Sequence, residues 1–307
     1  MLKPRALSPG DRIAIVAPAS PFPKDEFDEG IAELERLGFV PVYDESVFAR
    51  RDYLAGPPEL RAEALRRAWR DSSIAGVIAV RGGYGSMQVL PLLDRAEATR
   101  ACKPFIGYSD LTAVLSFLTL QCGVVSFHGP MLAKRLGRGE QGYDRSTFER
   151  ALFRKTAMGE ITAASVESIV NGEAAGMLIG GTLTQIVASL GTPFAFDPPA
   201  GHVLFLDEVS ERPYRIDRML TQLRQSGLLA RASAVVFNEL PKCDEPAGEP
   251  KARAAVADLL KGFPGPVLFG FPSGHTSGAS ITLPFGVRCR VVADARPRLI
   301  IEESAVS

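Results

Sequence analysis

The chain has 307 residues, of which 46% are hydrophobic and 23% charged, and its 35 basic side chains balance 35 acidic ones. This zero net charge excludes the basic excess that neutralises a phosphate backbone, so we expect no nucleic-acid partner. No apolar run in the sequence approaches the roughly 18 residues that span a bilayer, and the first residues lack the apolar middle of a signal peptide, so we expect a cytoplasmic protein with no membrane partner.

Cysteine and histidine are scarce and scattered. The four cysteines form no CxxC pair, so neither a zinc site nor a redox motif is indicated, and we expect no metal and no cofactor. Isolated cysteines suit a reducing compartment. The only imidazoles belong to His128, His202 and His275.

The first half alternates short apolar runs with amphipathic stretches. A buried strand is predicted at 12–20, helices at 23–39 and 58–70, and further strands at 76–80, 104–108 and 124–127. This rhythm predicts a parallel sheet covered by helices. Ligands of such sheets bind beyond the carboxyl ends of the strands. Here those ends read APAS, RGGYGS and GYSD.

The pattern weakens between about 133 and 175, where we place the domain junction. We expect an α/β protein with an N-terminal domain over 1–160, a linker region over 161–180 and a C-terminal β/α domain over 181–307. In the second half, a crossover helix is predicted at 176–194 and a second helix at 214–229. Strands are predicted at 202–208, 233–237, 266–271, 281–285, 288–292 and 298–303.

Ser109 stands where an apolar strand gives way to an apolar helix. One interpretation is an N-cap, whose hydroxyl accepts a hydrogen bond from a backbone amide two or three residues on. The other is a nucleophile on a tight turn, with the next amide directed at a developing oxyanion. Gly107 fits the small residue two positions before the nucleophile, but Leu111 replaces the second glycine of GxSxG. Both interpretations therefore stay open.

The glycine-rich segment RGGYGS, residues 81–86, follows a strand and opens a helix. Its spacing fits neither GxGxxG nor a P-loop. It is either a turn that needs positive φ or a loop whose glycines let backbone amides approach a substrate carbonyl.

Two adjacent carboxylates, Asp207 and Glu208, end the strand LFLDE. Side chains alternate along a strand, so only one of the two can face a given site. His275 lies in a loop rich in Gly, Ser and Pro. A serine, a carboxylate and a histidine on strand-end loops are the parts of an activated nucleophile. His128 is the rival base, although a packing role is also open, and His202 is interpreted as a surface residue.

Six segments together resemble the LD-carboxypeptidase family, which includes the microcin-immunity peptidases. They run in the same order from about residue 10 to the C-terminus and read RGGYGS, GYSD, FHGP, GGTL, LDEVSERPYRIDRML and FPSGHTSGASITLPFG. The resemblance implies a flavodoxin-like (glutamine-amidotransferase-like) N-terminal domain and a mixed β/α C-terminal domain. It also implies a serine peptidase with a Ser-Glu-His triad.

Family pattern puts the nucleophile at Ser109 and the base at His275. The family carboxylate falls on Asp207 by register, although relatives usually carry glutamate there, and Glu208 stays an alternative. The amides of Asp110 and Gly83 would form the oxyanion hole.

Substrate contacts would come from Gly82 and from Thr182, where many relatives have asparagine. Arg81 is the first candidate for the substrate carboxylate, against a structural ion pair, with Arg215 and Arg218 behind it.

Typical family members release the terminal D-alanine from cytoplasmic murein tetrapeptide during cell-wall recycling and are commonly homodimers, so we expect the same here. One alternative is an amidase that cleaves peptidyl-nucleotide antibiotics such as processed microcin. A pocket aromatic that stacks on a base would favour it, but the single tryptophan, Trp69, is expected to be structural. A second alternative is a non-catalytic peptide-binding protein on the same scaffold.

Overall fold

A parallel sheet organises the first half of the chain. The computed structural model describes residues 1–307. The sheet has the strand order β12-β5-β4-β3-β1-β2, in which only β12 is antiparallel to its neighbour. Its strands are β1 (Arg12–Val16), β2 (Val40–Val42), β3 (Ile74–Ala79), β4 (Phe105–Gly107), β5 (Ser126–His128) and β12 (Leu283–Phe285). The order 2-1-3-4-5 of the first five strands is that of flavodoxin-like folds.

Amphipathic helices cover this sheet, as the spacing of their apolar residues predicts. In α1 (Lys24–Arg36), Phe27 and Leu34 are buried, and in α2 (Pro58–Arg70), Leu65 and Trp69 are buried. The shorter helices are α3 (Ser86–Val89), α4 (Arg95–Ala101), α5 (Thr112–Ser116) and α6 (Arg145–Leu152). Trp69 is 5% exposed, in agreement with a structural role.

A mixed sheet of eight strands organises the second half. Its order is β6-β14-β13-β8-β9-β10-β11-β7, with a parallel centre of β8, β9, β10 and β11. Its strands are β6 (Gly159–Ile161), β7 (Glu167–Val170), β8 (Gly172–Thr182), β9 (His202–Asp207), β10 (Ala232–Phe237), β11 (Val267–Phe269), β13 (Arg288–Ala293) and β14 (Arg298–Ile301).

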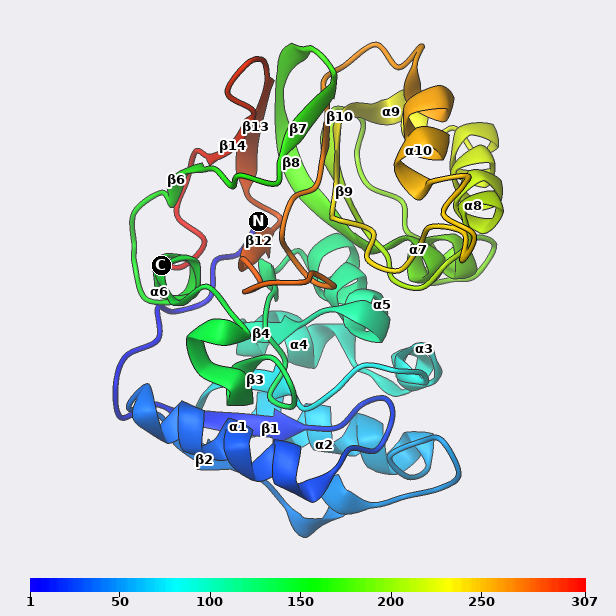
Figure 1. Ribbon diagram of the computed structural model, residues 1–307. Coiled ribbons are helices and arrows are strands. Elements are labelled where there is room, and N and C mark those ends of the chain that lie inside the picture. The colour runs from blue at the N-terminus through cyan, green and yellow to red at the C-terminus, as the bar shows by residue number, and fades with distance from the viewer.

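Helices α7 (Leu183–Ser189), α8 (Pro213–Gln225), α9 (Leu228–Arg231) and α10 (Ala252–Leu260) belong to this half and gather on one side of the sheet (Figure 1). The crossover helix predicted at 176–194 is therefore shorter than expected, because residues 176–182 belong to β8. No helix of the structure is both long enough and apolar enough to cross a bilayer.

The stretch 161–180, predicted to be a linker, is largely β-structure instead. It contains β7 and most of β8, which pair with β11, β9 and β13. The glycines of β8 favour a turn or linker in a prediction from sequence, so the strand is not recognised there. A Cβ on Gly176 would lie 2.0 Å from the carbonyl oxygen of Gly201, so the β8 backbone approaches the start of β9 too closely for any side chain.

The two halves share one hydrophobic core, and the C-terminal half contributes one strand to the first sheet. Ninety buried residues form a single apolar cluster. Strand β12 comes from the C-terminal half but pairs with β5 of the first sheet, with Leu283 opposite His128. It lies between the two parts of the molecule (Figure 1). The α/β class and the parallel N-terminal sheet are confirmed, and β12 ties β5 to the C-terminal half.

Candidate active site

Ser109 occupies the sharp bend that follows β4. Its φ of 63° lies in the left-handed region, which costs a non-glycine residue about 1–2 kcal/mol and is typical of strained functional sites. The 3-10 turn Ser109–Leu111 and then α5 follow, and no side chain caps either one. Structure therefore argues against the N-cap interpretation. Ser109 itself is half-buried.

The glycine loop packs directly on this serine. A Cβ on Gly82 would lie 2.9 Å from the Cβ of Ser109, 3.1 Å from its Oγ and 3.3 Å from the amide nitrogen of Asp110. Only a residue without a side chain fits there. The loop therefore brings its backbone against the hydroxyl, as the second interpretation of RGGYGS requires.

Free amides line this contact. The N–H groups of Gly83 and Asp110 donate to no group of the chain. Ser20, at the end of the β1 strand region, fixes the loop from outside: its amide donates to the carbonyl of Gly82, and its Oγ accepts from the amide of Tyr84 at 3.0 Å. A Cβ on Gly83, whose φ is 99°, would collide with that Oγ. Two unpartnered donors thus stand beside Ser109, where an oxyanion hole needs them.

Arg61 anchors the same loop from inside the protein. This α2 side chain is only 2% exposed, yet it forms no ion pair. Its guanidinium donates to the carbonyl oxygens of Pro18 at 2.6 Å, Gly85 at 2.8 Å and Gly56 at 3.1 Å. One side chain therefore joins the β1 loop to the glycine loop, a role that sequence reasoning missed.

Asp110 reaches into the protein rather than toward solvent. Its carboxylate accepts from the amide of Ser86 at 2.8 Å, and its backbone carbonyl accepts from the Ser86 hydroxyl. Burial raises the pKa of this carboxyl, and the hydrogen bonds from Ser86 oppose that rise. The side chain ties the Ser109 turn to the end of the glycine loop, and only the backbone amide of Asp110 stays unpartnered.

His275 is bound to Asp207 through both its ring and its backbone. The ring Nδ1 lies 2.8 Å from Oδ2 of Asp207, and the amide of His275 donates to Oδ1 at 3.0 Å. Asp207, the last residue of β9, is fully buried, whereas 17% of the His275 side chain is exposed. The carboxylate thus fixes the ring with Nδ1 toward Asp207 and leaves Nε2 as the nitrogen that can take a proton.

Two further residues complete the shell around Asp207. Asn238 donates from Nδ2 to Oδ1 of Asp207 at 2.6 Å and to the carbonyl of His275 at 2.6 Å. Thr182 donates from Oγ1 to Oδ2 at 3.2 Å. The segment that begins at Asn238 and runs to residue 250 is rich in polar and charged residues, which predicts a solvated loop, but Asn238 directly follows β10 and is fully buried. Thr182 is buried on the carboxylate, so its expected substrate contact stays a prediction.

The electrostatics of this pair follow from its burial. Burial alone would raise the pKa of Asp207, but the charge of His275, together with contacts from His128 and His275, holds that pKa far below its usual range. Burial alone would lower the pKa of His275, but the charge and hydrogen bond of Asp207 raise it. The carboxylate therefore stays ionised and strengthens the imidazole as a base.

Glu208 faces the opposite way, as strand alternation predicts. Its carboxylate accepts from the amide of Thr184 at 2.9 Å and from the Thr184 hydroxyl at 2.6 Å, at the start of α7. Burial raises its pKa. Glu208 has no contact with His275, so the geometry favours Asp207 as the orienting carboxylate.

Contacts across the two halves bring His275 beside the serine turn. The ring of Tyr108, which directly precedes Ser109, lies edge-on to the ring of His275 with their centroids 5.0 Å apart. Arg135 and Glu239 hold the loop around His275. The Arg135 guanidinium donates to the carbonyl of Gly278 at 2.7 Å, and Glu239 accepts from the amide of Ser277 at 2.9 Å.

The candidate arginines differ in their partners. Arg81, half-buried beside the glycine loop, forms no ion pair and donates to the carbonyl of Pro21 at 3.0 Å. Arg81 therefore lacks the structural ion pair that was the alternative to binding a substrate carboxylate. Arg215, on the first turn of α8, already pairs with Glu211 at 3.4 Å. Arg81 keeps most of its donors for an incoming carboxylate.

The two other histidines are buried, which corrects the surface position expected for His202. His202 is 1% exposed, and its Nδ1 lies 2.9 Å from the carbonyl oxygen of Pro199. His128 is fully buried at the end of β5, with its Nε2 3.8 Å from Oδ2 of Asp207. Because Asp207 and Ser273 enclose it, His128 is not the base that reaches Ser109.

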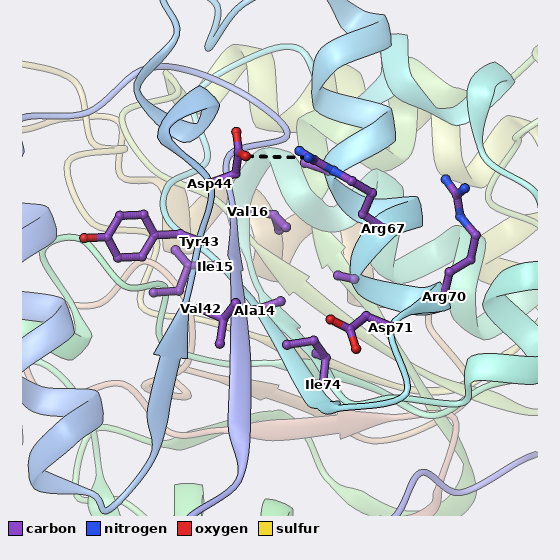
Figure 2. Close-up of a pocket in the computed structure, with 12 residues that line it drawn as sticks. Ala14, Ile15, Val16, Val42, Tyr43, Asp44, Arg67, Arg70, Asp71 and Ile74 are labelled. Atoms are coloured by element: carbon purple, nitrogen blue, oxygen red, sulfur yellow. Dashed lines mark ion pairs between the residues drawn. The ribbon is translucent and has the colours of Figure 1, made fainter.

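A groove of about 510 Å³ lies away from this site, beside the edge strand β2 and helix α2. Figure 2 shows its apolar floor of β1 residues and the ion pair between Asp44 and Arg67, 3.6 Å apart, at its rim. It shares no residue with the surroundings of Ser109, so its size is no reason to place chemistry there. No group of three His, Cys, Asp or Glu side chains that could hold a metal ion is present.

A strained serine, a glycine loop with free amides and a buried carboxylate–imidazole pair define the class of serine hydrolases on an α/β scaffold. Comparison with known proteins gives the family. Residues 13–129 match the LD-carboxypeptidase N-terminal domain, and residues 175–291 match the LD-carboxypeptidase C-terminal domain. The chain belongs to the LD-carboxypeptidase family of serine peptidases.

Individual relatives agree over nearly full length. The murein tetrapeptide carboxypeptidase of Pseudomonas aeruginosa is 31% identical over 271 residues, which cover 86% of this chain and 88% of that protein. A crystal structure of muramoyltetrapeptide carboxypeptidase from Oxalobacter formigenes is 30% identical, with a TM-score of 0.85 over 95% of this chain and 99% of the other. The microcin C7 self-immunity protein of Escherichia coli is 26% identical over 328 residues, 97% of this chain and 95% of that protein. A solved structure of that self-immunity protein, in complex with aspartyl sulfamoyl adenosine, has a TM-score of 0.91.

Proposed function

We propose that this protein is a serine LD-carboxypeptidase that releases C-terminal D-alanine from murein tetrapeptide. In this proposal Ser109 is the nucleophile, His275 the general base and Asp207 the residue that orients His275. The observation that carries the proposal is the double hydrogen bond between His275 and Asp207, with the His275 ring packed on Tyr108, next to Ser109 at positive φ. The relatives named for murein peptides supply the substrate class.

The chemistry proceeds in two balanced steps. The Oγ of Ser109 attacks the carbonyl carbon before D-alanine while Nε2 of His275 takes the hydroxyl proton. The tetrahedral intermediate collapses as His275 returns that proton to the leaving amine, so D-alanine departs and an acyl ester stays on Ser109. Water then attacks the ester, with His275 again as base, and frees the tripeptide and the serine. Asp207 stabilises the imidazolium in both steps.

Backbone amides and the charge of an arginine complete the proposed site. The unpartnered amides of Gly83 and Asp110 would hold the oxyanion, and each such donor is worth about 3 kcal/mol of transition-state stabilisation. Gly82 lets the substrate backbone pass close to Ser109. Arg81 would bind the free carboxylate of D-alanine bidentately. Thr182 would support Asp207 through its hydrogen bond, and its direct contact with substrate stays a prediction.

The cellular setting is also a proposal. All four cysteines are unpaired, which suits a reducing compartment. We therefore place the enzyme in the cytoplasm, where it would recycle cell-wall peptides as a homodimer.

The test is release of free D-alanine from L-Ala-γ-D-Glu-meso-diaminopimelate-D-Ala. We expect turnover by the wild-type chain and none by Ser109→Ala, with the same unfolding curve for both. D-Alanine release at the wild-type rate by Ser109→Ala would reject Ser109 as the nucleophile. Tight binding of the peptide by both chains without turnover by either would point instead to a non-catalytic binding protein.

A second candidate function is cleavage of a peptidyl-nucleotide antibiotic. The exposed tyrosine pair at the glycine loop favours it. Tyr84, 51% exposed, and Tyr53, 62% exposed, have ring centroids 5.7 Å apart. Such rings can stack on a nucleobase. Cleavage of an aminoacyl-sulfamoyl adenosine in place of the tetrapeptide would move the assignment to this function.

A further inference from the structure

The helix that follows the serine turn is bound to the C-terminal half through one buried threonine. Thr112 is the first residue of α5, directly after the turn Ser109–Leu111, and is 1% exposed. Its Oγ1 accepts a hydrogen bond of 2.9 Å from the backbone amide of Thr182, at the end of β8. No other residue between 105 and 116 forms a hydrogen bond with the C-terminal half. The chemistry proposed above assigns no part to Thr112.

The backbone of β8 approaches this threonine as closely as a chain can. Gly181, which precedes Thr182, has a φ of 141°. A Cβ there would lie 2.4 Å from Cγ2 and 2.5 Å from Oγ1 of Thr112. These distances exclude any side chain at residue 181, so the backbone of β8 lies directly on the side chain of Thr112.

The contact continues to the orienting carboxylate. Thr182 lies opposite Asp207 in the parallel register of β8 and β9, and its Oγ1 donates to Oδ2 of Asp207 at 3.2 Å. The same carboxylate oxygen lies 2.8 Å from Nδ1 of His275. A continuous path of hydrogen bonds therefore runs from Thr112 through Thr182 and Asp207 to the imidazole.

We propose that Thr112 is a positioning residue that holds the Ser109 turn at the separation from His275 that proton transfer needs. It acts through the amide of Thr182 and not on the substrate. For its effect on the reaction, the inference rests on the proposed roles of Ser109 and His275. Its structural content, that this hydrogen bond sets where Ser109 lies relative to His275, does not depend on those roles.

The hydroxyl oxygen is the part of the side chain that matters. A valine at residue 112 has nearly the same shape but carries a methyl group where the oxygen lies. The buried amide of Thr182 would then have no acceptor, which is unfavourable. Separation of α5 from the end of β8 relieves this penalty, because another acceptor can then reach the amide. Such a movement carries Ser109 away from His275, and a displacement of about 1 Å can lower a rate roughly 100-fold.

The first test is structural. Crystal structures of the wild-type protein and of Thr112→Val should differ in the separation of Ser109 from His275, which we expect to be larger in the variant. Thr112→Ser, which keeps the acceptor oxygen, should retain the wild-type separation. Wild-type positions of both residues in Thr112→Val would overturn the inference, whether or not the protein hydrolyses the tetrapeptide. Rapid hydrogen exchange of the Thr182 amide in the wild-type protein would also overturn it, and this measurement needs no variant.

The second test is kinetic and has two readouts. One is kcat for D-alanine release; the other is the rate at which an alkyl fluorophosphonate labels Ser109, a reaction in which Oγ displaces fluoride from phosphorus while His275 takes the hydroxyl proton. In Thr112→Val we expect both to fall by about 10- to 100-fold with little change in KM, and Thr112→Ser should restore them. Labelling of the wild-type chain without D-alanine release would reject the proposed substrate, and the labelling rates would then decide the present inference.

Thr119→Val is the matched control. Thr119 is 2% exposed and follows α5 in the same helical run, but its Oγ1 lies 2.8 Å from Oγ of Ser126, within the N-terminal half. Its substitution removes a buried hydroxyl without cutting the path to Asp207, so both rates should stay at the wild-type value. Equal losses in Thr112→Val and Thr119→Val would overturn the inference.

A double variant separates positioning from general support of the fold. Thr182→Val removes the hydroxyl that donates to Asp207 and keeps the amide that donates to Thr112. The two hydrogen bonds lie in series, so cutting both should have no more effect than cutting the one at Asp207. The labelling rate of the double variant should therefore equal that of Thr182→Val alone. Losses that multiply would show that Thr112 acts independently of this path and would overturn the proposed role.

Discussion

Asp207 receives two hydrogen bonds from His275, one from the ring Nδ1 and one from the backbone amide. Each carboxylate oxygen therefore has a donor from the same residue. A carboxylate can accept both, but a carboxamide has only one oxygen and would direct its NH₂ group at one of the two donors.

We expect Asp207→Asn to lower kcat for D-alanine release by about 10⁴-fold, because the amide favours the wrong His275 tautomer and cannot stabilise the imidazolium. Glu208→Gln is the matched control, since Glu208 bonds Thr184 instead. Steady-state kinetics on both variants checks this. Equal losses from the two would show that Asp207 has no special role.

The contact between Gly82 and Ser109 makes a second prediction. A methyl group at Gly82 would press on Cβ and Oγ of the serine, so Gly82→Ala should lower kcat by about 100-fold or more through displacement of the oxyanion donors. Gly278→Ala is the control, because nothing lies within 4 Å of its added Cβ. Crystal structures of both variants would locate the shift. A fully active Gly82→Ala would remove the glycine loop from the proposed site.

The pH dependence follows from the direction of the His275 shift. Burial alone would lower the pKa of His275, but the charge and hydrogen bond of Asp207 raise it above its ordinary value of about 6.5. A general base must be unprotonated, so kcat/KM should fall as pH drops through a pKa above that value. In Asp207→Asn the acidic limb should move down. A limb below pH 6 in the wild type would contradict the pairing.

The same shift has an opposite effect on stability. A histidine whose pKa is raised by folding stabilises the native state below its unfolded value of about 6.5, and this contribution disappears as pH rises through the folded pKa. Urea unfolding of wild type and His275→Gln between pH 6 and 9 should therefore show a difference that shrinks toward alkaline pH. A difference that grows with pH would refute this sign.

Periodicity and strand-end chemistry predicted the larger part of this molecule. The apolar runs marked the parallel strands, and polar residues at their ends marked Ser109 and Asp207, because the carboxyl ends of parallel strands share one edge. Alternation along β9 separated Asp207 from Glu208. Both arguments work because they need only local geometry and one rule about sheets.

Other features of the fold and the site could be recognised only in the three-dimensional structure. Strand β8 escaped notice because its glycines serve close backbone approach rather than a turn, and composition does not distinguish the two. Asn238 stood before a loop of charged residues, although its place directly after β10 was a usable signal. Arg61 resembled any other arginine on a helix. Its burial depends on the carbonyls of Pro18 and Gly85 in two distant loops and on that of Gly56 just before its own helix. The burial of His202 likewise depends on tertiary packing.

Arg61 supplies a fifth prediction. It donates to three carbonyl oxygens and to Gln88, and a lysine cannot satisfy that planar set. Arg61→Lys should cost about 2–3 kcal/mol of unfolding free energy and lower kcat/KM through a loosened glycine loop. Arg70→Lys, on the same helix but with an exposed partner in Glu63, should cost at most about 1 kcal/mol. Urea titrations and kinetics measure both. Similar small effects from the two would show that Arg61 does not anchor the loop.

Substitutions at the exposed tyrosine pair would distinguish the two candidate substrates. Tyr84 belongs to the glycine loop that contacts Ser109, and its ring meets that of Tyr53. If the pair stacks on a nucleobase, Tyr84→Ala should lower kcat/KM for an aminoacyl-sulfamoyl adenosine by about tenfold or more and leave the tetrapeptide nearly unaffected, because base–aromatic stacking is worth about 1–3 kcal/mol. Tyr84→Phe should retain the wild-type rate, since stacking needs the ring and not the hydroxyl. Exposed Tyr214 on α8 gives the matched Tyr214→Ala control. An equal loss on both substrates would mean that Tyr84 supports the loop rather than selecting a ligand.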